Sequence, residues 1–324
     1  MEVNHIELFQ KSSTRNKNDE TNKKREKCLE LCNTPEHPFF KDAVYGPKWV
    51  NLGNGLIKFI NATLEKRSLA TTYTRFSLQR LGGRSNHIDF LITLHYESSF
   101  ETINFEFKFN SVPQFANIYE KDSYIETTLA EWWYDKGWLD EMCKPYKEIV
   151  SSDSLIYSKP PRDQYLKEVN KGVGTKSPPS FFKDWWELDH SKDSAIDKAN
   201  TERKKIVHSG IKSYLTEYGT SFDIEKFSSY LNETQKAKVY GIWKPTQQEF
   251  AILEYSEEEM SPTDILSVTK NSIILQAGPS KMKLLLRWKN TIGVTLPCWQ
   301  ASIQRPKAIP SSRKPAKPNS SSPK

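Results

Sequence analysis

The strict alternation of apolar and polar side chains in residues 102–110 constrains the fold of this chain more than any other feature. Apolar side chains occupy the odd positions and polar ones the even positions: Ile103, Phe105, Phe107 and Phe109 against Asn104, Glu106, Lys108 and Asn110. Successive side chains of a β-strand point to opposite faces of its sheet. The pattern therefore predicts a strand with one buried, largely aromatic face and one polar face.

A second alternating segment, residues 88–94, lies shortly upstream and predicts another strand. The polar residues 96–101 between the two segments are few enough for a hairpin, so the strands are expected to be antiparallel neighbours. Helical spacing of apolar residues predicts helices over 54–67, 69–81, 124–149, 202–218 and 223–231. β-prone segments predict further strands at 238–244, 249–255, 272–277, 281–289 and 298–303. Together these elements indicate an α/β protein.

The charge of the chain is unevenly distributed. The formal net charge is +7, but residues 305–324 hold six basic residues and no acidic one, which leaves 41 basic and 40 acidic residues elsewhere. That Pro- and Ser-rich end is expected to be a disordered basic tail. Residues 1–36 are expected to form a polar, basic extension, and residues 37–304 one domain. Pro, Ser and charged residues at 151–198 indicate an insertion or linker within that domain.

Long apolar segments are missing from the sequence. No run approaches the roughly 18 apolar residues of a membrane span, and the first residues, Met1 to His5, lack the apolar core of a secretion signal. The protein is therefore expected to be intracellular, neither secreted nor bound to a membrane.

Two acidic residues and one lysine are the best candidates for chemistry. On the strand 102–110, Glu106 and Lys108 share the polar face, and Asp89 opens the strand that is expected to pair with it. Two carboxylates can hold Mg²⁺, which prefers oxygen ligands, and a nearby ammonium can stabilise the charge on a phosphate that is being displaced. The same residues would be an ordinary solvated strand face if they had no ligand.

The arrangement resembles the PD-(D/E)xK, or restriction-endonuclease-like, nucleases. The resemblance rests on the helix 54–67, on Asn86-His87-Ile88-Asp89 at the start of an apolar strand, and on Phe105-Glu106-Phe107-Lys108 in the next strand. It implies a mixed central sheet with an αβββαβ core. It also implies that Asp89 and Glu106 bind Mg²⁺ or Mn²⁺ and that Lys108 assists hydrolysis of DNA. Ile88 stands where the family usually has proline.

The resemblance also indicates accessory residues. Some members carry an acid on the preceding helix, where this chain has Glu65, and some carry Gln and Tyr after the lysine, where it has Gln114 and Tyr119. Each of the three is otherwise a surface, loop or packing residue. His87 would share a strand face with Asp89, either as a general base or as a hydrogen-bonding residue at the rim of the site.

A second region strengthens the likeness to uncharacterised members encoded by large DNA viruses. It consists of Arg287-Trp288-Lys289-Asn290, Gly293 and Pro297-Cys298-Trp299-Gln300. If the chain is viral, its expected location is the cytoplasm or nucleus of the host cell.

A basic strand is the candidate surface for nucleic acid. Four cations alternate with apolar residues in this segment: Lys281, Lys283, Arg287 and Lys289. Such a row suits a phosphate backbone, which supplies much of non-specific DNA affinity. A lysine-decorated edge strand that resists aggregation explains the pattern equally well.

The sequence therefore predicts a metal-dependent DNA nuclease, an endonuclease rather than an exonuclease. One alternative is a nucleic-acid-binding protein of the same fold without cleavage, and another is a structural or protein-interaction factor. Whether two chains must pair as a homodimer to cut both strands stays open. No Gly-rich phosphate loop or nucleophile elbow indicates another enzyme class.

Overall fold

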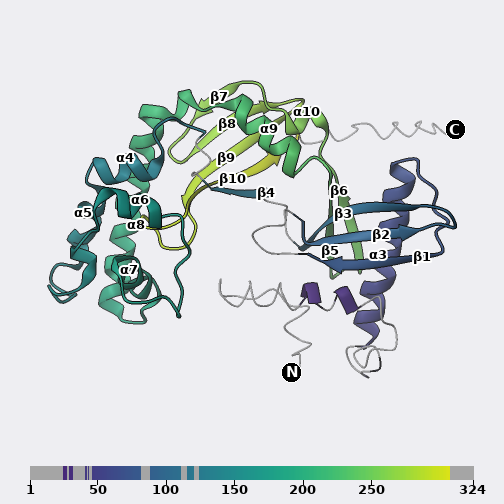
Figure 1. Ribbon diagram of the computed structural model, residues 1–324, viewed down its shortest axis with the longest axis horizontal. Coiled ribbons are helices and arrows are strands. Elements are labelled where there is room, and N and C mark those ends of the chain that lie inside the picture. Colours follow the sequence, from purple (N-terminus) through teal and green to yellow (C-terminus); the bar gives the residue numbers. More distant parts are fainter. Residues whose placement is uncertain are drawn as a thin grey trace, which may run out of the picture.

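The computed structural model describes residues 25–27, 29–31, 41, 43, 46–81, 88–110, 115–119 and 124–306, with only the backbone described at 48, 49 and 115–119. Figure 1 shows two sheets in different parts of the molecule. The long helix α3 (Gly46–Lys66) accompanies one sheet, and the helices α4 to α9, which lie between Leu129 and Thr234 in the sequence, accompany the other. Each sheet has its own cluster of buried apolar side chains. The prediction of a mixed α/β protein is confirmed.

The first sheet is mixed and has the strand order β1-β2-β3-β5-β6. Its strands are β1 (Arg75–Arg80), β2 (Phe90–His95), β3 (Phe100–Phe109), β5 (Lys238–Lys244) and β6 (Glu249–Leu253). The first three pair antiparallel, so the hairpin predicted from the two alternating segments is confirmed. β5 is parallel to β3, and the segment between these two strands in the sequence contains β4 and the helices α4 to α9 of the second part of the molecule.

Helix α3 (Gly46–Lys66) covers the apolar face of this sheet. Its buried side chains recur every three or four residues: Leu52, Leu56, Phe59, Ile60 and Leu64. They pack in one cluster with Phe105 and Phe107 of β3, and the full burial of each such side chain is worth about 1.5–3 kcal/mol. The alternation in β3 thus buries its aromatic side chains under α3 and leaves Glu106 and Lys108 on the opposite face.

The prediction of a second helix over 69–81 is wrong, because residues 75–80 form β1. β1 is an edge strand in which Leu78 alone is buried, opposite Ile92 of β2. A strand with so few apolar side chains has a weak two-residue period, so its sequence does not distinguish it from a helix.

The second sheet is antiparallel and has the order β4-β10-β9-β8-β7. Its strands are β4 (Phe115–Tyr119), β7 (Ile265–Val268), β8 (Ser272–Ala277), β9 (Ser280–Trp288) and β10 (Pro297–Gln304). The inward side chains of β8, β9 and β10 join the larger apolar cluster, which also contains Trp133 and Trp185 from the helices. Gly210 of α8 (Ser194–Tyr218) allows close packing there, because a Cβ at this position would clash with the Trp133 ring.

Helices share the apolar cluster of the second sheet. They are α4 (Leu129–Asp135), α5 (Trp138–Cys143), α6 (Arg162–Glu168), α7 (Phe181–His190), α8 (Ser194–Tyr218) and α9 (Ile224–Thr234), with the short α10 (Glu257–Met260) before β7. Residues 151–198, predicted as an insertion or linker, contain α6 and α7. Tyr165 and Trp185 of these helices are fully buried in the cluster.

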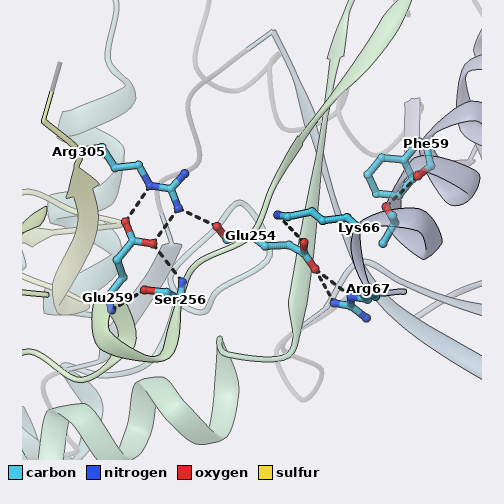
Figure 2. Close-up of polar contacts among 8 residues, drawn as sticks. Phe59, Lys66, Arg67, Glu254, Ser256, Glu259 and Arg305 are labelled. Carbon is cyan, nitrogen blue, oxygen red and sulfur yellow. Dashed lines mark hydrogen bonds and ion pairs between the residues drawn. The ribbon is translucent and has the colours of Figure 1, made fainter. Parts of the chain in front are cut away.

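Polar contacts join the two parts where the chain leaves β6 (Figure 2). The Glu254 carboxylate pairs with Lys66 at 2.6 Å and with Arg67 at 2.7 Å, both at the end of α3. The Glu254 carbonyl accepts a 2.7 Å hydrogen bond from Arg305, which follows β10 and also holds the Glu259 carboxylate with two 2.7 Å bonds. The predicted tail thus begins with an anchored residue, and residues 307–324 lie outside the described part of the chain.

A Glu259→Gln variant is expected to lower the free energy of unfolding by about 2 kcal/mol at pH 7, because a buried carboxylate loses charge-assisted hydrogen bonds. The Glu259 side chain is only 5% exposed, and it accepts hydrogen bonds from Arg305, Ser256 and Ser280. Burial alone would raise the pKa of Glu259, but these donors hold it below its usual value of 4.5.

The pH dependence of this effect follows from the direction of the shift. A lowered pKa in the folded state gives stability that is present above pH 4.5 and lost as the pH falls through the folded value. Urea unfolding should therefore show a difference between wild type and Glu259→Gln that shrinks below that pH. Glu257→Gln, an exposed position on the same helix, is the matched control. If Glu259→Gln and Glu257→Gln lower the free energy of unfolding equally at pH 7, the prediction is contradicted.

Candidate functional site

Asp89, Glu106 and Lys108 lie together where β2 begins and β3 ends. Asp89 immediately precedes β2, and its Oδ2 accepts a 3.0 Å hydrogen bond from the backbone N–H of Phe107 in β3. This bond holds the carboxylate beside the neighbouring strand. Because side chains alternate along β3, Glu106 and Lys108 are on the same face, opposite the buried phenylalanines.

The Lys108 ammonium bridges the two carboxylates. Its Nζ lies 2.7 Å from Glu106 Oε1 and 3.7 Å from Asp89 Oδ2. The three side chains are between 15% and 24% exposed, so they are largely shielded yet reachable from solvent. The convergence predicted from the strand pattern is present in the structure.

A second lysine, which the sequence analysis did not identify, comes from β5. Lys238 is 6% exposed, and its Nζ lies 3.5 Å from Glu106 Oε2, so each Glu106 oxygen faces an ammonium. The parallel register places Lys238 opposite Asn104 and Tyr240 opposite Glu106. The pairing of β3 with a strand about 130 residues later brings Lys238 here, and no local pattern indicates that pairing.

The site shifts the pKa values of its members. Burial, then the charge of Glu106, raises the pKa of Asp89 to about 6, although Lys108 and the Phe107 N–H act in the opposite direction. Burial alone would lower the pKa of Lys108, but Glu106 and Asp89 raise it above its usual value. Burial lowers the pKa of Lys238, despite the attraction of Glu106. A buried carboxylate with a raised pKa beside a charged lysine is typical of functional sites.

A third acid, Glu26, borders the site from the N-terminal segment. Its carboxylate accepts hydrogen bonds from Arg80 of β1, with Nε at 3.2 Å and Nη2 at 3.1 Å. Burial raises the pKa of Glu26, and Lys108 and Glu106 also act on it. The adjacent Arg25 is 3% exposed, with its guanidinium 3.6 Å from the centre of the Phe109 ring. Part of the predicted N-terminal extension therefore packs against the first sheet.

The donor set of the site fits a hard divalent cation. Mg²⁺ is usually held by one or two carboxylates and completes its shell with water, and Asp89 and Glu106 supply two carboxylates. Their mutual repulsion, seen in the raised pKa of Asp89, would be relieved by a cation. Within the described residues, no cluster of three or more His, Cys, Asp or Glu is arranged to hold a metal. Asp89 and Glu106 are the residues that would hold Mg²⁺ or Mn²⁺.

The accessory residues do not join this cluster within the described part of the chain. Glu65 is exposed at the end of α3, the helix that packs on the opposite face of the sheet. Tyr119 is in β4 of the second sheet, and its side chain is not described. His87 and Gln114 lie outside the described residues.

The basic strand predicted at 281–289 is β9, and its alternation is confirmed. Lys281 is exposed, and Lys283 and Arg287 are half-buried on the face opposite the apolar cluster. Lys289 follows the last residue of β9, so it is not in the row. The interpretation as an edge strand is wrong, because β9 lies between β8 and β10. These cations therefore lie on the central strand of the second sheet, and Lys281 is the exposed one among the three.

Comparisons with known proteins assign no family to this chain. No protein-family model matches the sequence, and no curated protein is similar to it. Among the described residues, no helix combines the length and the apolar character that crossing a membrane requires.

Proposed function

We propose that this protein hydrolyses phosphodiester bonds of DNA with a divalent metal ion held by Asp89 and Glu106. The observation that carries the proposal is the position of the Lys108 ammonium, 2.7 Å from Glu106 and 3.7 Å from Asp89 on one strand face. Two carboxylates and an adjacent cation form a compact set that can bind a metal and stabilise a charged phosphoryl group.

The order of elements around the site supports the same proposal. Helix α3 precedes an antiparallel meander of β1, β2 and β3, and the chain then returns through helices to β5, which is parallel to β3. This order is similar to the αβββαβ order that the resemblance to restriction-endonuclease-like nucleases implies, and the similarity supports the proposal. In that family the two carboxylates and the lysine occupy these strands, so the resemblance and the geometry agree on the same three residues.

Each side chain has a distinct task in the proposed reaction. A water oxygen forms a bond to phosphorus while the bond to the leaving oxygen breaks, and negative charge grows on the phosphoryl oxygens. Lys108 donates hydrogen bonds to these oxygens or orients the water, and Lys238 holds Glu106 from its other oxygen. A bound Mg²⁺ would supply Lewis-acid stabilisation of the same charge.

The proposal is tested by incubating the full chain with supercoiled plasmid, linear duplex, single-stranded DNA and RNA, in Mg²⁺, in Mn²⁺ and in EDTA. The expected result is cleavage of at least one DNA substrate that requires metal, with nicked or internally cut products if the enzyme is an endonuclease. Failure to cut any DNA in either metal would contradict the proposal.

A second candidate function, DNA binding without cleavage, is favoured by the cations of β9. Contacts between cations and phosphates make the affinity for DNA fall steeply with salt. If this candidate is correct, the protein will bind DNA in a salt-dependent manner, form no products, and bind equally well after Glu106→Ala. Loss of that binding in a Lys281→Gln, Lys283→Gln double variant would locate it on β9.

A further inference from the structure

A pocket of about 380 Å³ lies between α8 and the turn that joins β7 to β8. Its lining comes from two separate elements: His208, Ser209 and Lys212 of α8, and Lys270 and Asn271 of the turn. His208 and Lys212 are one helical turn apart and therefore on the same side of α8. Every described lining residue can donate a hydrogen bond, and none is acidic.

The turn that carries Lys270 and Asn271 is held firmly. Thr269 donates its N–H to the Ser272 carbonyl at 2.8 Å, which closes the turn, and Leu286 of β9 donates its N–H to the Asn271 carbonyl at 2.9 Å. The Ser272 hydroxyl donates to Asn271 Oδ1 at 3.0 Å, so the side-chain NH₂ of Asn271 remains as a donor. Because these hydrogen-bond donors are already fixed before a ligand binds, little conformational entropy is lost on binding.

The two lysines have no carboxylate partner among the described residues. Other exposed lysines of the same part do: Lys205 pairs with Glu202 at 2.7 Å, and Lys236 pairs with Glu257 at 2.9 Å. Lys212 and Lys270 reach one pocket from different elements, so an anion bound there would be attracted to both. Two ammonium groups, an amide NH₂ and a hydroxyl match the several acceptor oxygens of a phosphate.

We propose that this pocket binds a phosphate group, with Lys212 and Lys270 as its two cations and Asn271 and Ser209 as neutral donors. The proposal goes beyond the function proposed above, because the pocket belongs to the second sheet and uses none of the residues of the carboxylate site. The phosphate belongs either to a polynucleotide backbone or to a small phosphorylated molecule, since both present the same oxygens.

The test uses the full chain with two probes. One probe is inorganic phosphate, followed by ³¹P NMR, and the other is a fluorescently labelled single-stranded oligonucleotide, followed by anisotropy over a range of salt concentrations. The variant is Lys212→Gln, Lys270→Gln. The control is Lys198→Gln, which changes the same type of charge at an exposed position of α8, roughly 21 Å from Lys212 at 1.5 Å per residue.

The double variant is expected to bind inorganic phosphate at least about tenfold more weakly than wild type, because it removes both charge-assisted contacts. If the pocket holds a polynucleotide backbone, the slope of log affinity against log salt should also fall in magnitude by about 1.4, because the probe is single-stranded and two phosphate contacts are lost. If the double variant loses affinity for inorganic phosphate alone, the pocket binds small phosphorylated molecules. If it loses affinity for the oligonucleotide alone, the pocket binds the polynucleotide backbone.

The proposal is overturned if wild type binds neither probe. It is also overturned if the double variant binds both probes with the same affinity as wild type and the control variant. Both substituted lysines are exposed, so the variant is expected to keep its far-UV circular dichroism and melting temperature. This experiment measures binding and not cleavage. Failure of the phosphate-binding proposal is therefore distinguishable from failure of the proposed nuclease activity.

Discussion

A Lys108→Met variant is expected to cleave DNA about 10²- to 10³-fold more slowly than wild type, the usual cost of removing one donor to a developing oxyanion. Lys108 is the one described cation that contacts both Asp89 and Glu106, and methionine keeps most of its length without its charge. Both carboxylates remain, so Mn²⁺ binding should be retained. Loss of cleavage with retained metal binding would identify Lys108 as a group that acts on the substrate.

The control for this experiment is Lys58→Met, the same substitution on the exposed side of α3, which covers the opposite face of the sheet. Initial rates of plasmid nicking, measured with both variants and wild type in one metal buffer, check the prediction. Cleavage by Lys108→Met at the rate of wild type would show that the lysine has no part in the reaction.

An Asp189→Ala variant is expected to lower the free energy of unfolding by about 3–5 kcal/mol, because it leaves a buried charge unpaired. Arg203 of α8 is fully buried and forms an ion pair with Asp189, whose side chain is 12% exposed. Within the described residues, Nε and Nη1 of Arg203 have no hydrogen-bond partner. The guanidinium lies 4.9 Å from the centre of the Trp185 ring, so the pair connects α7 and α8 inside the larger apolar cluster.

Two further variants separate charge from packing. Asp189→Leu combined with Arg203→Met removes both charges and is expected to recover most of the lost stability, since apolar side chains often replace a buried ion pair without cost. Asp135→Ala, which breaks an ion pair whose side chains are 43% and 49% exposed, should cost less than about 1 kcal/mol. Urea unfolding of the three variants checks the predicted order of their free energies of unfolding. Equal losses of this free energy for Asp189→Ala and Asp135→Ala would contradict the prediction.

The local part of the candidate site could be predicted because it depends on the two-residue period. The alternation around Glu106 fixes which side chains share a face, and the short connection 96–101 makes β2 and β3 antiparallel neighbours. These two facts bring Asp89 next to Glu106 and Lys108. Nothing beyond one hairpin is needed for that prediction.

The rest of the site depends on contacts between distant segments. Lys238 reaches Glu106 only because β5 pairs in parallel with β3, and Glu26 reaches the site because the N-terminal segment packs beside β1 and β3. The burial of residues 151–198 also depends on contacts outside this segment. Residues 151–198 are rich in Pro and Ser, yet Tyr165 and Trp185 in this stretch are fully buried, and they pack against Tyr134 and Tyr146, which lie outside it.

The most direct measurement of the central claim is nicking of supercoiled plasmid by wild type and by Asp89→Asn, each in Mg²⁺ and in EDTA. We expect nicked circles only for wild type in Mg²⁺, because Asp89→Asn removes a carboxylate that is needed to hold the ion. Cleavage by Asp89→Asn as fast as by wild type, or no cleavage by wild type in Mg²⁺, would contradict the assignment of this carboxylate site to metal-dependent hydrolysis.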